Sequence, residues 1–173
     1  MIFKVVGGVT SHLIDQLWSS SDTLTEDIDA ALDTTSAQQG HYKNRFVQNW
    51  QTFNPQEAKV VLYSGGTEVA SLKFNAVGTD KLSWFSQEKL VQSPWTDLKT
   101  ATNLQAFSIN GADRIFEISG RYTGCSTDYG WFLIPKGNCP WETRLPQASI
   151  LSVQQTGYLC QLESIWYEKG SQR

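Results

Sequence analysis

The stretch Ala58-Lys59-Val60-Val61-Leu62-Tyr63-Ser64-Gly65-Gly66-Thr67-Glu68-Val69-Ala70-Ser71-Leu72-Lys73-Phe74 decides the fold class of this chain. Two runs typical of strands flank Ser64-Gly65-Gly66, and glycines supply the positive φ that a tight hairpin turn requires. In the second run the apolar residues Ala70, Leu72 and Phe74 alternate with polar ones, which is the period of a half-buried strand. The stretch therefore predicts a β-hairpin.

Working outward, turn signals such as Asn54-Pro55 separate further short strands. The expected strands are Phe3–Val6, Tyr42–Phe53, Leu104–Ile109, Arg114–Ser119, Trp131–Ile134, Ser149–Val153 and Tyr158–Tyr167. Two short helices are expected, one within Asp22–Leu32 with Thr23 or Thr25 as its cap, and one at Ser86–Leu90. So many short strands with minor helices predict an all-β fold of the β-sandwich or jelly-roll kind.

The composition is that of one globular domain. The chain has 173 residues, of which 40% are hydrophobic and 12% aromatic. A chain of this length buries roughly two-thirds of its unfolded surface in a single core. Because no repeat, low-complexity tract or proline-rich linker divides it, we expect a single domain over residues 1–173.

Charge and hydropathy argue against two classes of partner. The net charge is −3, and no Lys/Arg cluster interleaved with aromatic residues is present, so nucleic acid is not an expected partner. The longest apolar runs, such as Val60–Tyr63 and Trp131–Ile134, are far shorter than the roughly 20 residues of a membrane span. Met1–Gly8 lacks the regions of a signal peptide. Two expectations stay open: a cytoplasmic protein, or a secreted one whose signal has been replaced.

The cysteines bear on this choice, since three of them permit one disulfide and leave one thiol. Cys125 and Cys139 lie on either side of a predicted strand and a glycine turn. A bridge between them would close a loop of about fifteen residues and stabilise the fold by about 3 kcal/mol. Cys160 has apolar neighbours, where a buried thiol is the usual outcome. The alternatives are three reduced cysteines in a cytosolic protein, or pairing of Cys160 with another molecule.

Aromatic residues in turn-rich segments give the strongest signal for a binding site. Flat rings stack on the apolar faces of sugars, while carboxylate and guanidinium groups bind the hydroxyls. Asp128 is the expected acceptor and Arg121 the expected donor. The aromatic members of the predicted site are Trp84, Trp95, Tyr129, Trp131 and Trp141. The alternative interpretation is that the tryptophans fill the ends of the core and Asp128 caps a turn.

Support for catalysis and for metal binding is sparse. The chain has two histidines, and no Gly-x-Ser-x-Gly motif accompanies them. His41, with Asp128, is the candidate for a catalytic pair, and a solvated loop histidine is the alternative. The acidic run Glu26–Asp33 lacks the glycine and the final glutamate of an EF-hand loop. No ligand spacing suits zinc, so we expect neither a metal nor a cofactor.

Several landmarks together resemble one known family. They are His41-Tyr42-Lys43-Asn44-Arg45, Trp50–Glu57, Lys81–Ser86, Gly124-Cys125-x-x-Asp128-x-Gly130-Trp131 and Cys139-x-Trp141. In order and spacing they resemble an uncharacterised extracellular domain of molluscs and related invertebrates. The resemblance spans residues 41–141 and implies secretion, which favours an oxidised Cys125–Cys139 bridge. It implies no activity and no catalytic residues.

Three classes of function follow from these observations. The first is a secreted recognition module, lectin-like, that binds carbohydrate or another small amphipathic ligand at the aromatic end of the sandwich. The second is a cofactor-independent enzyme of the esterase or oxygenase type with an aromatic cavity, and an enclosed pocket containing His41 or His12 would distinguish it. The third is an extracellular matrix protein that self-associates through exposed aromatic residues or Cys160.

Overall fold

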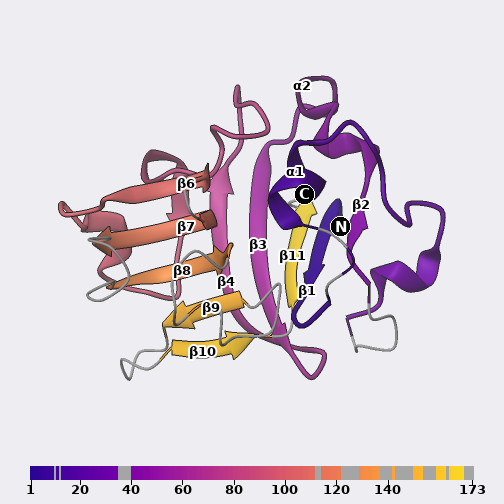
Figure 1. Cartoon of the computed structure of the whole chain (residues 1–173). Helices are drawn as coiled ribbons and strands as arrows, with labels where there is room; N and C mark the ends of the chain where they lie inside the picture. The colour runs from indigo at the N-terminus through magenta and orange to yellow at the C-terminus, as the bar shows by residue number, and fades with distance from the viewer. Residues whose placement is uncertain are drawn as a thin grey trace.

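The structure is a computed structural model that describes residues 1–9, 11, 13–34, 40–111, 114–121, 129–136, 142, 150–153, 159–162 and 164–169. Two antiparallel sheets make up most of it, and the strands of one sheet run across those of the other (Figure 1). In spatial order the six-stranded sheet contains β2 (Tyr42–Lys43), β1 (Phe3–Val6), β11 (Ser164–Lys169), β3 (Glu57–Ser64), β4 (Thr67–Asn75) and β5 (Leu90–Gln92). The five-stranded sheet contains β10 (Leu159–Leu162), β9 (Ile150–Val153), β8 (Tyr129–Pro135), β7 (Arg114–Arg121) and β6 (Ala106–Asn110).

The predicted all-β, sandwich-like architecture is thereby confirmed, and its helical elements are short. They are the α-helices α1 (Ile14–Ser19) and α2 (Trp50–Phe53) and the 3-10 turns η1 (Asp29–Leu32), η2 (Arg45–Val47), η3 (Gln87–Lys89) and η4 (Leu98–Thr100). Within the part of the chain that the structure describes, none of the helices is long and apolar enough to cross a lipid bilayer.

The predicted hairpin is confirmed as β3 and β4, which pair along their length from Glu57↔Asn75 to Ser64↔Thr67. Gly65 and Gly66 form the connection with φ values of 55° and 77°. Positive φ at both central residues fits the type I′ hairpin turn, whose twist matches that of the flanking strands.

Three expectations about local structure are wrong. Instead of one strand over Tyr42–Phe53, the chain leaves β2 after Lys43 because the Asn44 side chain caps η2 by accepting the Phe46 N–H at 3.0 Å. Tyr158–Tyr167 is divided between β10 and β11, which belong to different sheets. In Asp22–Leu32 only η1 is helical, because Leu24 instead pairs with Lys43 as an isolated bridge.

Aromatic residues from both sheets and from α1 fill the core. Trp18 of α1 packs edge-on against Phe3 of β1 at 5.0 Å and against Phe116 of β7 at 5.1 Å, measured between ring centroids. Trp84 packs edge-on against Phe74 of β4 at 5.3 Å and stacks with Trp50 at 5.7 Å. Trp18 therefore anchors α1 between the two sheets, and this fixes the position of the helix on which the candidate site depends.

Candidate functional site

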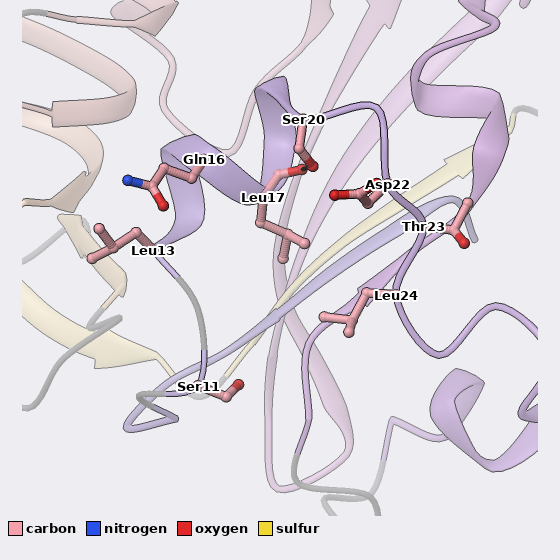
Figure 2. A pocket seen from close by; sticks show the side chains of 8 residues that line it. All are labelled: Ser11, Leu13, Gln16, Leu17, Ser20, Asp22, Thr23 and Leu24. Atoms are coloured by element: carbon pink, nitrogen blue, oxygen red, sulfur yellow. Dashed lines mark hydrogen bonds between the residues drawn. The ribbon is translucent and has the colours of Figure 1, made fainter.

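A groove of about 430 Å³ lies between α1 and the segment that follows it (Figure 2). Its lining residues are Ser11, Leu13, Gln16, Leu17, Ser20, Asp22, Thr23 and Leu24. Three are leucines, and the other five carry hydroxyl, amide or carboxylate groups. Small-molecule sites commonly have this size and combine apolar contact area with a few polar groups that orient the ligand.

One wall of the groove is formed by Leu13 and by residues of α1, including the partly accessible edge of Leu17. Ile14, Leu17 and Trp18 turn inward and are buried, whereas Leu13 at the N-cap is 60% exposed. The N-cap side chain makes no capping hydrogen bond, although Ser, Thr, Asp and Asn are the residues that stabilise a helix there. An exposed leucine at this position contributes apolar surface to the groove at the expense of helix stability.

Lys43 joins the two walls of the groove. Its backbone exchanges hydrogen bonds with Leu24 of one wall, at 2.9 and 3.0 Å. Its Nζ donates to the Leu17 and Ser20 carbonyl oxygens of the other wall, at 2.6 Å each, and to Ser20 Oγ at 3.3 Å. The last carbonyls of a helix lack partners within it and favour a nearby cation. Lys43 therefore stabilises the end of α1 and also holds the two walls of the groove at a fixed distance from each other.

A second side chain supports the same helix end. Gln48 Nε2 donates to the carbonyl oxygens of Trp18, at 3.1 Å, and of Ser20. Its Oε1 accepts from Lys81 Nζ at 2.6 Å. The amide is therefore held in one orientation, in which it binds carbonyls at the end of α1.

The environment of Lys43 disfavours its charge. The pKa of Lys43 is lowered to about 8, mainly by burial and also by the nearby positive charge of Lys81, while the carboxylate of Asp22 opposes both effects. Figure 2 shows the Asp22 side chain pointing toward Leu17 and Ser20, the residues to which Lys43 is bonded. Lys43 is therefore a lysine whose charge state changes near neutral pH.

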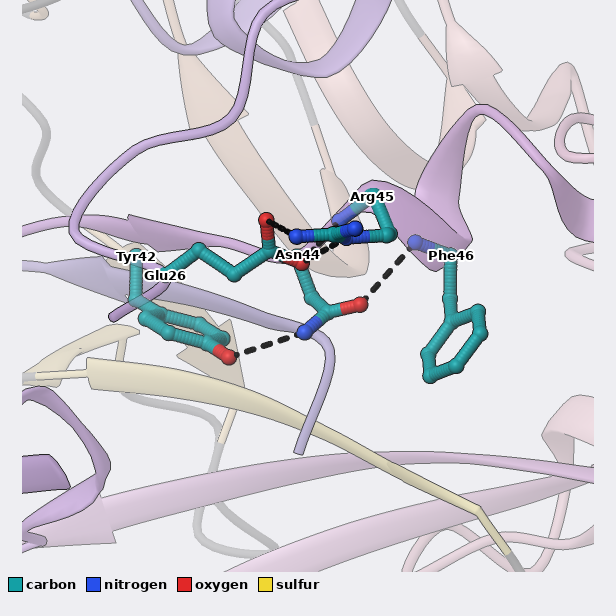
Figure 3. Close-up of polar contacts among 5 residues, drawn as sticks. All are labelled: Glu26, Tyr42, Asn44, Arg45 and Phe46. Atoms are coloured by element: carbon teal, nitrogen blue, oxygen red, sulfur yellow. Dashed lines mark hydrogen bonds and ion pairs between the residues drawn. The ribbon is translucent and has the colours of Figure 1, made fainter. Parts of the chain in front are cut away.

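A polar cluster that contains the exposed Arg45 side chain lies beside β2 (Figure 3). Glu26 accepts two hydrogen bonds from the Arg45 guanidinium, at 2.9 and 3.1 Å, and one from the Arg45 backbone N–H at 2.9 Å. The bonds from Arg45 lower the pKa of the Glu26 carboxyl. Asn44 is fixed in turn by a bond to Tyr42 Oη at 3.1 Å. This cluster holds η2 against the segment that contains Glu26.

A buried ion network lies in the five-stranded sheet. Arg114 Nε donates to Glu142 Oε1 at 2.9 Å, and its Nη1 lies 3.4 Å from Glu117 Oε1. All three side chains are buried. A Cβ at position 111 would lie 2.7 Å from Glu117 Oε2, so Gly111 permits the approach of this carboxylate. The Glu117 and Glu142 carboxylates share the Arg114 guanidinium. The bond from Arg114 holds Glu142 against β7.

Three aromatic residues of the predicted site, Trp84, Trp95 and Trp131, are described by the structure as buried. Trp84, Trp95 and Trp131 are 0%, 7% and 9% exposed and belong to the hydrophobic core. The Trp131 indole N–H donates to Asp97 Oδ1 at 3.1 Å. Arg121 and Tyr129 are partners in the β7/β8 register. Burial of the three indoles agrees with the interpretation in which tryptophans fill the ends of the core, and limits the ring surface they offer to a ligand.

The remaining predicted residues divide into two groups. His41 is 1% exposed and accepts a hydrogen bond from the Val6 N–H at its Nδ1, so the expectation of a solvated loop histidine is wrong. It does not line the groove. The others lie outside the described residues: His12, Cys125, Asp128, Cys139 and Trp141. The described residues contain no group of three or more side chains suited to hold a metal ion.

Comparison with known proteins adds no assignment: no protein family, curated protein or solved structure matches this chain. The resemblance to an invertebrate extracellular domain stays a prediction. Sequence reasoning missed the groove because its walls are a helix of only six residues and a segment expected to be helical. The polar run Ser19–Thr23 was a signal for it, since so many hydroxyl groups between apolar residues indicate exposed backbone turns.

Proposed function

We propose that this protein is a recognition module that binds a carbohydrate or another small amphipathic ligand, and that the ligand occupies the groove along α1. The supporting observation is the division of the groove lining into leucine side chains and hydroxyl, amide and carboxylate groups. A sugar has the same division, with C–H faces that contact apolar side chains and hydroxyls that form hydrogen bonds. The proposal moves the ligand away from the tryptophans, which have little exposed ring surface.

The charge of the lining restricts the class of ligand further. Among the lining residues that the structure describes, Asp22 is the ionisable one, and its carboxylate accepts hydrogen bonds from hydroxyl or amine groups. Leu13 and Leu24 lie on opposite walls (Figure 2), so a ligand with one apolar face can contact both. A neutral polyol with an alkyl substituent, such as n-hexyl β-D-glucopyranoside, is therefore a suitable first probe.

The test uses Leu13→Ser, because it changes stability and binding in opposite directions. Serine at the N-cap accepts a backbone N–H, so we expect the free energy of unfolding to increase by about 1 kcal/mol. Loss of the leucine contact should weaken binding of n-hexyl β-D-glucopyranoside by on the order of tenfold. Urea unfolding measures the first quantity, and a titration followed by amide chemical shifts measures the second.

Leu82→Ser is the matched control, since Leu82 is another exposed leucine, at 39%, and does not line the groove. We expect it to leave the affinity for the glucoside unchanged. A weaker binding in Leu13→Ser cannot result from destabilisation if that variant unfolds at higher urea concentration. Chemical-shift changes confined to the surroundings of Trp131 and Asp97 would instead favour ligand binding at the aromatic end. If the glucoside causes no shift changes and the protein is not retained on a glycan array, the recognition function is contradicted.

We also propose that the protein is extracellular and that Cys125 and Cys139 form its disulfide. The supporting observations are the low charged fraction of 18% and the resemblance of residues 41–141 to a secreted invertebrate domain. An enzyme of the esterase or oxygenase type is less supported, because His41 is buried away from the groove.

A further inference from the structure

Lys43 differs from the other residues around the groove because it is titratable, buried and bonded to both walls. It is 0% exposed, and its Nζ contacts three acceptors that all belong to lining residues: the carbonyl oxygens of Leu17 and Ser20 and the hydroxyl of Ser20. An ammonium group has three donors and no acceptor. The three contacts therefore match the protonated form, in which Ser20 Oγ accepts from Lys43 and donates its own proton to the Leu17 carbonyl oxygen, 3.4 Å away.

The neutral amine would rearrange one of these bonds. It has two N–H donors, enough for the two carbonyl oxygens at 2.6 Å, and a lone pair that accepts from the Ser20 hydroxyl. Ser20 Oγ would then donate to Lys43 instead of to the Leu17 carbonyl oxygen. The groove would also lose a positive charge from directly behind its lining.

We propose that Lys43 is a proton switch for the groove: with its proton the groove favours anionic ligands, and without it cationic ligands. This inference rests on the proposed function, since it concerns the same site. It adds regulation by pH and predicts which ligand charge is favoured on each side of the transition.

Two charged groups face Lys43 and influence its charge. Lys81, from the loop after β4, repels the ammonium and lowers the pKa, while Asp22, from the segment after α1, attracts it and raises the pKa. Burial has the largest effect, and the resulting pKa is about 8. A group that titrates there changes its charge within the ordinary range of extracellular and cellular pH.

The other charged side chains on the surrounding elements are directed elsewhere. On β1, Lys4 Nζ donates to the Asp33 carbonyl at 3.4 Å. On α1, Asp15 pairs with Lys136 at 3.5 Å. On η2, Arg45 pairs with Glu26. Lys81 and Asp22 are therefore the positions at which substitution should tune Lys43.

The first experiment follows the Lys43 side chain by NMR in the ligand-free protein labelled at lysine. We expect a transition near pH 8 that the amides of Ser20 and Asp22 report as well. Asp22→Asn should move the midpoint to lower pH, and Lys81→Met to higher pH. Lys99→Met is the control, since Lys99 is exposed on η4 and should leave the midpoint unchanged.

Stability supplies a second readout that needs no ligand. Because the fold lowers the pKa of Lys43 from 10.5 to about 8, the unfolded chain binds more protons between these values, and the contribution of Lys43 to the free energy of unfolding rises with pH in this window. Urea midpoints measured across the window should show this rise, and Lys43→Met should lose it. If Lys43→Met does not fold, the NMR titration of the wild-type protein still decides the question.

The second experiment compares butyrate with butylammonium, which share an alkyl chain and keep opposite charges between about pH 7 and pH 9. We expect the affinity ratio of butyrate to butylammonium to fall by at least severalfold over this range, and to be independent of pH in Lys43→Met. A ratio that does not change with pH while both probes bind would overturn the switch, as would a Lys43 that keeps its proton above pH 10. Absence of binding by either probe, with a normal Lys43 transition, would instead contradict the groove as a binding site.

Discussion

At the scale of single residues, the same arginine–glutamate pairing has two different consequences in this protein. Arg45 lies on the surface with a side chain that is 65% exposed, where water competes for its bonds to Glu26. Arg114 is 1% exposed and is the cation within hydrogen-bonding distance of two buried carboxylates, those of Glu117 and Glu142. Burial, more than the number of bonds, decides how much each arginine matters.

Replacing Arg114 should therefore be costly. Arg114→Met removes the cation that lies beside two buried carboxylates, and we expect the free energy of unfolding to fall by about 3 to 5 kcal/mol. Urea unfolding followed by tryptophan fluorescence measures the change. The matched substitution Arg45→Met should leave the urea midpoint almost unchanged, and equal effects of the two would show that burial of the network does not determine its strength.

At the scale of elements, the β3/β4 turn offers a test of whether backbone conformation alone accounts for the glycine at position 65. Gly65 has φ of 55°, and a Cβ built on it meets no atom within 4 Å. Substitution there changes conformational energy without causing a clash. We expect Gly65→Ala to destabilise the fold by about 1 kcal/mol, and Gly65→Asn to be nearly neutral, because asparagine tolerates the left-handed region. Thermal unfolding of both variants checks this, and equal losses would contradict the role of φ.

The elements also show which features the sequence can predict. The hairpin was predictable because its turn and its alternation are local and agree with each other. Tyr42–Phe53 was not, because its apolar residues suit either a strand or a helix and the decision depends on one side-chain cap at Asn44. The division of Tyr158–Tyr167 between two sheets depends on pairing with distant strands, which no local pattern encodes.

The candidate site was less predictable than the fold for the same reason. In the sequence, Lys43 is one polar residue of an expected strand. Its burial becomes evident only in the fold, where α1 and Leu24 pack around it. The tryptophans were recognised as important, yet their burial depends on how the two sheets pack.

At the scale of the whole molecule, the predicted disulfide tests the proposed compartment. If Cys125 and Cys139 are bridged, the denatured, unreduced protein should have one thiol that reacts with a maleimide, against three after reduction. Protein expressed with a secretion signal and analysed by mass spectrometry gives both counts. The double variant Cys125→Ser, Cys139→Ser should lose about 3 kcal/mol of stability. Three reactive thiols without reduction would contradict an oxidised, extracellular form.

The position of β11 affects how the chain is made. β11 lies between β1 and β3, so the N-terminal strand is joined to the main sheet through a strand near the other end of the sequence (Figure 1). While a ribosome synthesises the chain, β1 can pair with β2 early, but its other edge has no partner until Ser164–Lys169 has left the exit tunnel. Completion of the six-stranded sheet is then a late event, and the edge of β1 that faces β11 stays open to other strands until β11 is made.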